Sequence, residues 1–500
     1  MIMEIQLKGF NKMNKIFKVS LLSALLVLMS CEIPADLNDN PNEITVSDVD
    51  ANLFLNGAQL ANVIVQVSHL NRISGMYSGQ LIGYASLYSN IHGYALSTVE
   101  TNGEWNRAYV GVVANTRHIQ ESAPDDKLLF GITQVLEAHA ISSLAILTGD
   151  VPFSEVVSDN EAPKFDDQKA VLDGCSTLLS DAITTLTGAT SRAEAYDIYY
   201  GGDKDKWIAA AYTLKARIAL IKKDYASALS NAGMGISSSA GDMMYIPRGD
   251  AATPNGDKNL YWEILNGSRT GDLGNAKSGN RSYLIDILDP THASYRGNAK
   301  TNEEARYGYY SIDETSASGN TGVVEQFEPQ PMVTYTENQL IKAEASARTS
   351  GFSSGLSALN SYRTWLASGG RLNANHNDAS KYKYDAYLEA DFISGGMENS
   401  DGLTKEQALL REIIEERYVS GFGTYMPFND HRRLRGAGET NLIPPFPLNT
   451  QSATKHVERL PWAQDEITSN STVSEDPGLY EKTAVNRSVS YTHLRAHETR

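Results

Sequence analysis

The chain has 500 residues, and its 43 Lys and Arg against 60 Asp and Glu give a formal net charge of −17 at neutral pH. This acidic balance argues against a nucleic-acid partner, because binding to phosphates requires a basic surface that releases counterions. A hydrophobic content of 41% with 21% charged residues is that of a globular chain and excludes wholesale disorder.

The N-terminus has the pattern of an export signal. Three lysines precede an apolar run at residues 19–29, which is too short to cross a membrane. The run ends in Leu28-Met29-Ser30-Cys31, which resembles a bacterial lipobox, so we expect residues 1–30 to be removed and Cys31 to carry the lipid. The alternative is an ordinary signal peptide with a chance cysteine.

Two neighbouring segments complete this end of the chain. Met13 looks like the natural start, so we interpret residues 1–12 as an upstream extension. Residues 31–48 are polar and contain Pro34 and Pro41, which is typical of an extended tether. We therefore expect a membrane attachment through the N-terminal lipid, followed by a domain at residues 49–488.

Apolar residues at helical spacing predict the first helices of this domain. The third of them ends at Gly149 with Pro152 just beyond, a pattern that stops helices. Cys175 lies on the fourth and is expected to be a small buried residue. The four predicted stretches are Val49 to His69, Glu104 to Glu121, Lys127 to Leu147, and about Asp167 to Thr187.

Two later segments have the pattern of helix pairs. Residues 207–232 keep a helical apolar stripe, which Lys223-Asp224 interrupts before a second stretch with spaced alanines. Residues 340–362 repeat this arrangement around Gly351. Small residues let two helices approach closely, as in tetratricopeptide repeats. The units are degenerate and far apart, so we expect helix pairs that support long loops rather than a regular solenoid.

Residues 236–281 and 289–330 are long, polar and predicted to be loops, and the second contains several tyrosines. Loops of this length are usually functional or disordered, and their aromatic content favours function. The chain has 26 Tyr against 12 Phe and 5 Trp. Tyrosine suits a binding groove because it combines an apolar ring with a polar hydroxyl, although the simpler interpretation of any one ring is packing between helices.

The sequence contains none of the familiar catalytic motifs, and we predict no catalytic residue, no metal ligand and no cofactor. A glycosidase would need two carboxylates across a cleft, which a sequence does not exclude. The run Asp430-His431-Arg432-Arg433 is predicted to be a structural network in which arginines bind carboxylates or carbonyls.

The far end of the chain resembles the conceptual translation of a sequencing adapter. We therefore expect residues 489–500 to be foreign to the protein and leave them out of the fold. His493 and His497 consequently carry no weight as metal ligands, although their spacing would suit a metal on a helix.

Five motifs in order resemble those of the SusD/RagB family of surface nutrient-binding lipoproteins. Singly each is weak, but their order behind a lipobox is specific. The motifs are residues 36–42 (DLNDNPN), residues 149–155 (GDVPFSE), residues 335–345 (YTENQLIKAEA), residues 428–433 (FNDHRR) and residues 459–470 (RLPWAQDEITSN), the last with Trp462 where the family has Tyr.

This resemblance implies a mainly α fold: four tetratricopeptide-like helix pairs supporting a loop-rich region with little strand. It implies a lipoprotein on the outer face of the outer membrane that binds a nutrient, most often an oligosaccharide. It also implies a partner, a SusC-like TonB-dependent transporter that this protein would cap. No catalysis is implied, and the motif residues themselves look structural.

The resemblance does not transfer ligand contacts, so the binding residues are predicted from the aromatic loops. The candidates are Tyr77, Tyr84, Tyr88, Tyr94, Tyr307, Tyr309 and Tyr310. Two other functions stay open: a surface glycoside hydrolase, and a helical-repeat scaffold with only protein partners.

Overall fold

The computed structural model describes residues 50–156, 160, 162–249, 256–473 and 475–487. The predicted signal peptide, Cys31, the tether and the adapter-like end all lie outside these ranges. From Ala51 onward the chain groups into one unit, distinct from Met1–Asp50, and the description below concerns that unit alone.

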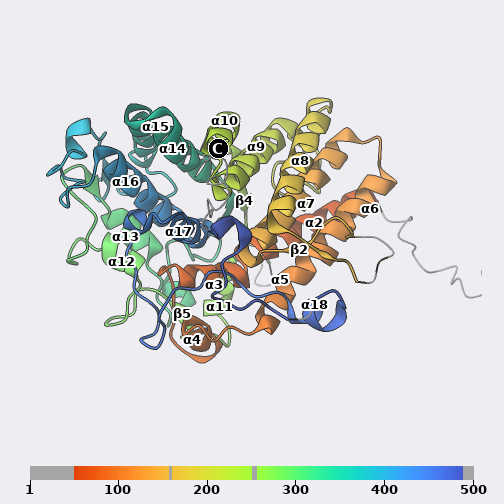
Figure 1. The fold of residues 1–500 in the computed structure, drawn as a ribbon, viewed down its shortest axis with the longest axis horizontal. Coiled ribbons are helices and arrows are strands. Elements are labelled where there is room, and N and C mark those ends of the chain that lie inside the picture. Colours follow the sequence, from red (N-terminus) through yellow and green to blue (C-terminus); the bar gives the residue numbers. More distant parts are fainter. Residues whose placement is uncertain (1–49, 157–159, 161, 250–255, 474, 488–500) are drawn as a thin grey trace, which may run out of the picture. The chain divides into compact units, whose positions relative to one another are not determined.

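Helices dominate the unit (Figure 1). The α-helices are α2 (Ala51–Val67), α3 (His69–Tyr77), α4 (Ser86–His92), α5 (Asn102–Asn106), α6 (Asn115–Ser122), α7 (Lys127–Thr148), α8 (Gln168–Thr187), α9 (Lys204–Ile221), α10 (Tyr225–Ala232), α11 (Leu260–Leu265), α12 (Tyr283–Leu288), α13 (Glu304–Tyr310), α14 (Tyr335–Ser350), α15 (Phe352–Leu366), α16 (Lys405–Ser420), α17 (Met426–Ala437) and α18 (Gln464–Ser469). A π-helix, Arg107–Ala114, joins α5 to α6.

In the described part, strands occur only as short antiparallel pairs. These are β1 (Ile82–Gly83) with β5 (Leu273–Gly274), β2 (Val151–Pro152) with β3 (Phe165–Asp166), β4 (Met243–Tyr245) with β7 (Gln330–Val333), and β6 (Thr301–Asn302) with β8 (Lys383–Tyr384). Three of these pairs join segments that are far apart in the chain, and β2 with β3 closes a shorter loop. They hold loops in place rather than forming a sheet core.

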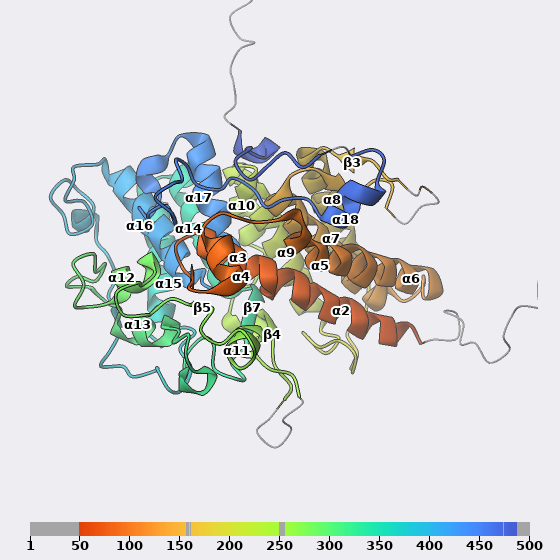
Figure 2. The same ribbon diagram turned by 90° about the horizontal axis from the view of Figure 1, so that it is seen from below.

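The long helices pack as successive pairs, α7 with α8, α9 with α10 and α14 with α15. These pairs lie along one side of the unit, at the top of Figure 1, and the loop-rich segments with α4, α11, α12 and α13 lie below them. Figure 2 gives the view from below, from the side on which α4 and α11 lie. The prediction of a mainly α fold built from helix pairs with little strand is confirmed.

Local sequence signals explain where these helices begin and end. The predicted stops are confirmed: Gly149 has φ of +94° and Gly351 has φ of +87°, conformations that side chains other than glycine rarely adopt. Aspartates accept backbone N–H groups at four helix starts, which satisfies donors that the helix leaves unpaired. They are Asp126, Asp167, Asp203 and Asp224.

Two predicted segments differ in detail from the structure. The stretch from Val49 to His69 is interrupted at Ser68, where α2 ends and α3 begins. The stretch from Glu104 to Glu121 is helical throughout but contains the π-helix, and segments of this kind occur often at functional sites.

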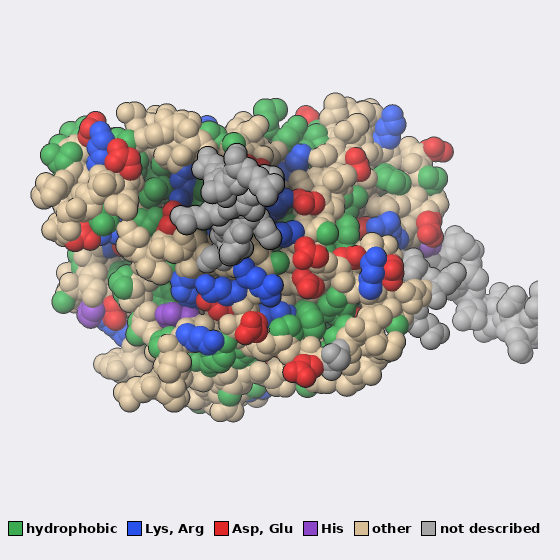
Figure 3. All heavy atoms as spheres, in the orientation of Figure 1, with side chains coloured by type: hydrophobic (Ala, Val, Ile, Leu, Met, Phe, Trp, Pro, Cys, Tyr) green, Lys and Arg blue, Asp and Glu red, His purple; other side chains and the backbone are tan. Residues whose placement is uncertain are grey.

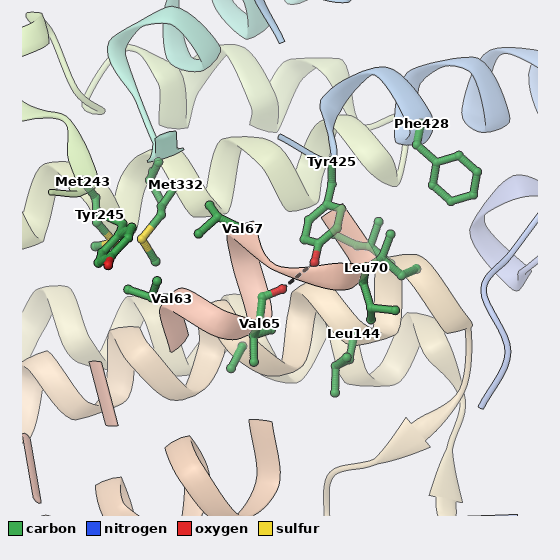
Figure 4. Packing of buried hydrophobic residues seen from close by; sticks show 14 of the residues in the cluster. Val63, Val65, Val67, Leu70, Leu144, Met243, Tyr245, Met332, Tyr425 and Phe428 are labelled. Atoms are coloured by element: carbon green, nitrogen blue, oxygen red, sulfur yellow. Dashed lines mark hydrogen bonds between the residues drawn. The ribbon is translucent and has the colours of Figure 1, made fainter. Parts of the chain in front are cut away.

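The core is continuous across both sides of the unit. Helix α7 is long and apolar enough to cross a membrane, but 94% of its apolar window is buried inside the protein, as in the central helix of a globular domain. Cys175 on α8 is fully buried, as predicted. Figure 4 shows Val63 and Val67 of α2 lying toward Met243 of β4 and Met332 of β7, and the Val65 carbonyl accepting a hydrogen bond from the Tyr425 hydroxyl just before α17.

The run at residues 430–433 is a buried structural network, as predicted. The Arg433 guanidinium donates to Glu344 of α14 at 2.8 Å and to Asp430 at 2.9 Å. Arg432 instead donates to backbone carbonyls, including those of Ile146 and Glu458, each at 3.1 Å. These bonds tie α17 to α7 and α14, so the run stabilises the scaffold.

Candidate functional site

Three of the predicted ligand-binding tyrosines on the 77–94 segment are buried. Tyr77 is 1% exposed, and its ring lies 5.4 Å from that of Tyr94. The Tyr88 hydroxyl accepts a hydrogen bond from Arg72 at 2.8 Å, and the Tyr94 hydroxyl accepts the N–H of Asn449 at 3.0 Å. In this conformation the three rings pack the loops together and offer no open face.

Tyr84 is the partly exposed member of that group. Its hydroxyl donates to the Asn280 carbonyl at 3.0 Å, and the Lys277 ammonium lies 4.9 Å from the ring centre. Ser86 (φ of +51°) and Tyr94 (φ of +69°) follow on the same segment. Such backbone strain occurs often at functional sites, so Tyr84 stays a candidate, with one ring face occupied by Lys277.

The second predicted group lies on a helix, which corrects the prediction that residues 289–330 form a loop. Tyr307, Tyr309 and Tyr310 all belong to α13. Tyr309 is 2% exposed and donates to Glu328 at 2.7 Å, while Tyr310 is 5% exposed. The loop prediction was wrong here because burying these large rings is more favourable than leaving them exposed to water. Their burial orders the segment around them.

A cleft lined by aromatic rings lies elsewhere, between α5, the π-helix, the turn after α7, and α18. We call it the aromatic cleft, and its volume is about 320 Å³. This is the lower end of the size of small-ligand sites. Figure 1 shows α5 and α18 close together at the right of the loop-rich side. The residues that line it are Asn102, Trp105, Asn106, Tyr109, Val110, Pro152, Glu155, Val156, Asn160, Pro163, Ala463, Asp465, Glu466, Ser469 and Asn470.

Packed aromatic rings lie beneath the cleft: Trp105 is 5% exposed, and Tyr109 is half-buried. Trp105 and Tyr109 are one helical turn apart, with ring centres 5.6 Å apart. Trp105 also stacks on Phe165 of β3 at 6.0 Å, and Phe165 meets the edge of Trp462 at 4.8 Å. The Tyr109 hydroxyl donates to the Pro152 carbonyl at 2.8 Å. These contacts fix the rings in place before any ligand arrives.

The rim of the cleft is polar and acidic. Its charged residues are Glu155, Asp465 and Glu466, and none of the residues that line it is Lys, Arg or His. Two amides join the walls: Asn102 accepts the N–H of Asp465 at 3.2 Å, and Asn470 donates to the Pro163 carbonyl at 2.7 Å. Preset hydrogen-bonding groups around an apolar floor are the usual pattern of a small-ligand site.

Sequence reasoning did not find this cleft. Pro152 and Glu155 belong to the 149–155 motif, and Glu466 and Asn470 belong to the 459–470 motif, both interpreted as structural. The structure brings these two motifs together although about three hundred residues separate them. One local pattern could have indicated the cleft: Trp105 and Tyr109 are four positions apart in a predicted helix and therefore lie on one face of it.

The chemistry of the cleft suits a neutral or positively charged polar ligand. Sugars present apolar C–H faces and many hydroxyls, so stacking on rings together with amide and carboxylate partners fits them. An acidic rim disfavours an anionic ligand. Across the described ranges, no group of three or more His, Cys, Asp or Glu lies together in a way that would hold a metal ion.

The face of the molecule shown in Figure 3 carries mixed charge. Lys and Arg side chains gather near the middle of the face in Figure 3, although the chain as a whole is acidic. Local charge therefore differs from the average, and ligand preference depends on the site rather than on the net charge.

A family model matches most of the chain. Residues 41–435 match the SusD-like model described as "Starch-binding associating with outer membrane". No curated protein matches the sequence at a significant level.

Solved structures share the fold at low sequence identity. A SusD/RagB family protein from Bacteroides thetaiotaomicron is 19% identical with a TM-score of 0.64, over 88% of this chain and 99% of that one. A chitin-binding SusD homologue from Flavobacterium johnsoniae is 15% identical with a TM-score of 0.62, over 87% and 98%. A SusD homologue from Bacteroides fragilis is 17% identical with a TM-score of 0.58, over 88% and 100%.

Proposed function

The chain belongs to the SusD-like family, and from this membership we propose that it is a cell-surface lipoprotein that binds an oligosaccharide in the aromatic cleft. Cys31 would carry the lipid in the outer membrane, and the domain would face the exterior. The bound sugar would then pass to a SusC-like TonB-dependent transporter that this protein caps.

The aromatic cleft is the observation that carries the binding proposal. It combines an open volume of about 320 Å³ with a rigid floor of Trp105 and Tyr109. A neutral sugar gains apolar burial on such a floor without needing a charged partner. The family description, starch binding, and the chitin-binding homologue point to the same class of ligand.

The binding test uses an exposed residue of the cleft so that the fold is left intact. Val110 lines the cleft and is 60% exposed, so Val110→Arg places a long side chain in the binding space. Ile246→Arg is the matched control, because Ile246 is 56% exposed and does not line the cleft. Calorimetric titration with starch and chitin oligosaccharides should show binding by the wild type and the control and none by Val110→Arg.

Binding of all three proteins with equal affinity would exclude the cleft as the site, and Tyr84→Ala would then test the alternative surface. Failure of the wild type to bind any glycan on an array would reject oligosaccharide binding. That result would favour the scaffold interpretation, in which the only partners are proteins.

A glycoside hydrolase is the second candidate, because three carboxylates line the same aromatic cleft. Hydrolysis needs two carboxylates on opposite sides of the scissile bond. Purified protein incubated with each glycan that it binds should release no reducing ends if the protein only binds. Release that disappears in Glu155→Gln or Glu466→Gln would establish the enzyme instead.

The transporter partnership has its own test. Native membranes extracted in a mild detergent should yield a large TonB-dependent barrel together with the tagged lipoprotein. A Cys31→Ser variant should leave the outer membrane, since the proposed attachment is through the lipid on Cys31. Recovery of the lipoprotein without any barrel, in detergent that preserves other membrane complexes, would reject the capping role.

A further inference from the structure

A second, smaller cavity lies between α13, the ends of α15 and α16, and the loop after α15. Its volume is about 20 Å³, enough for roughly one or two water-sized groups and too small for a sugar ring. It shares no lining residue with the aromatic cleft. Tyr310 of α13, Trp365 of α15 and Arg371 are among the residues that line it.

The turn that follows α15 places Arg371 at this cavity. Gly369 and Gly370 have φ of +103° and +56°, which reverses the chain directly before Arg371. The Arg371 guanidinium is close enough to Tyr309 and Tyr310 to interact electrostatically with their hydroxyls. Arg371 and Tyr310 therefore converge on the cavity from different elements.

Three hydrogen-bond donors at this cavity have no acceptor within the described residues. They are the Arg371 guanidinium, the Trp365 indole N–H and the Tyr310 hydroxyl. The rest of the lining is already paired: Arg306 bonds to Glu303 and Glu416, and the Tyr384 hydroxyl donates to Glu303 at 2.8 Å. None of the three is among the fully buried unpaired atoms of the described residues, so a ligand or water can reach each donor and supply its acceptor.

The nearby carboxylates do not neutralise this site directly. Asp242 accepts the Tyr335 N–H at 2.6 Å, and Glu328 accepts from Tyr309 at 2.7 Å and from Asn373 at 2.9 Å. Neither makes an ion pair with Arg371 among the described residues. No Asp or Glu lines the cavity itself.

We propose that this cavity binds the carboxylate group of a small ligand, with Arg371, Trp365 and Tyr310 as its donors. A carboxylate is acceptor-only, fits the volume, and matches the planar guanidinium with two parallel hydrogen bonds. The rest of the ligand lies at the mouth of the cavity, outside the space that the carboxylate fills. The carboxylate belongs either to a sugar acid or to an amino acid.

The Trp365 indole N–H gives a direct readout of occupancy. The chain has five tryptophans, so the ¹⁵N-labelled protein shows five indole cross-peaks, and Trp365→Phe identifies the one at this site. Sodium glucuronate at millimolar concentrations should shift that cross-peak saturably, and glucose should leave it unchanged. N-acetylglycinate, an amino-acid carboxylate without a sugar, separates the two sources.

Variants that remove single donors provide the second measurement. Arg371→Gln should weaken glucuronate binding at least about tenfold, since it removes a charge-assisted pair. Tyr310→Phe should weaken glucuronate binding less, and Arg248→Gln, at an exposed residue, should leave it unchanged.

The two carboxylates distinguish the source of the ligand. Equal shifts of the Trp365 cross-peak with glucuronate and N-acetylglycinate support recognition of any small carboxylate, and a shift with glucuronate alone supports a sugar acid.

Two results would overturn the proposal. One is the absence of any shift of the Trp365 cross-peak with both carboxylates. The other is a shift of the same size with glucose, or one that Arg371→Gln leaves intact, because either would mean that the charge of Arg371 plays no part. Each variant is first checked by its unfolding midpoint, and if Arg371→Gln is unfolded, Tyr310→Phe and Trp365→Phe carry the test by calorimetric titration.

Discussion

Substituting Glu344 by Gln tests the buried network that joins α14 to α17. The Glu344 carboxylate is fully buried and accepts from Arg433 at 2.8 Å and from Arg348 at 2.9 Å. Arg417 lies 3.6 Å away. Burial alone would raise the pKa of this carboxyl, but the three arginines outweigh burial and lower the pKa from its ordinary 4.5 to about 2.

The depressed pKa of Glu344 determines how much this carboxyl stabilises the fold and over which pH range that stabilisation is lost. A carboxyl whose pKa is depressed in the folded state stabilises the fold above its unfolded pKa and loses that contribution as pH falls through its folded pKa. The shift from 4.5 to about 2 corresponds to about 3 kcal/mol. Glu344→Gln also removes one of the two buried carboxylates that pair with Arg433 and leaves Asp430, so we expect a loss of about 3–5 kcal/mol at pH 7.

Urea unfolding measured across the pH range provides the assay. The wild type should lose stability between about pH 4.5 and pH 2, and Glu344→Gln should show a smaller loss over that window, since it lacks this titrating group. Glu439→Gln is the matched control: Glu439 also binds Arg348, at 2.7 and 2.8 Å, but its side chain is 32% exposed. We expect it to cost less than about 1 kcal/mol.

Two results would refute this reasoning. One is a Glu344→Gln variant as stable at pH 7 as the Glu439→Gln control. The other is an acid-unfolding profile identical to that of the wild type. Either would mean that the arginines find other partners or water when Glu344 loses its charge, and that the buried network does not depend on this carboxylate.

Three further outcomes are expected. Gly149→Ala should destabilise the fold by about 1–3 kcal/mol in urea unfolding, because a φ of +94° strains any residue with a Cβ, and a variant as stable as the wild type would contradict this. Cys175, whose thiol pKa is raised by burial, should resist a thiol reagent in a Cys31→Ser background until the protein unfolds; fast labelling of the native state would contradict this. Tyr109→Phe removes the hydrogen bond to Pro152 and should lower the free energy of unfolding by about 1 kcal/mol, measured by thermal unfolding. A variant as stable as the wild type would mean that this bond does not form.

The helices could be predicted because their signals are local. Apolar spacing, aspartate caps and glycine stops within a few residues fixed α7, α8 and the pairs α9–α10 and α14–α15, and burial of Cys175 followed from its place on an apolar stripe. The order of five short motifs was enough to indicate the family. The structural role of Arg432 and Arg433 could be predicted because guanidinium groups bind carboxylates and carbonyls.

The sites depended on contacts that no local pattern encodes. Tyr309 and Tyr310 stood out in the sequence as loop aromatics, yet the structure buries them, because whether a ring is open depends on what distant segments pack against it. The aromatic cleft likewise joins Trp105 and Tyr109 to α18, over 350 positions later. The sequence by itself determined the helices and the family; the tertiary structure alone decided which rings are open, since exposure depends on long-range packing, whereas helix formation depends mainly on neighbouring residues.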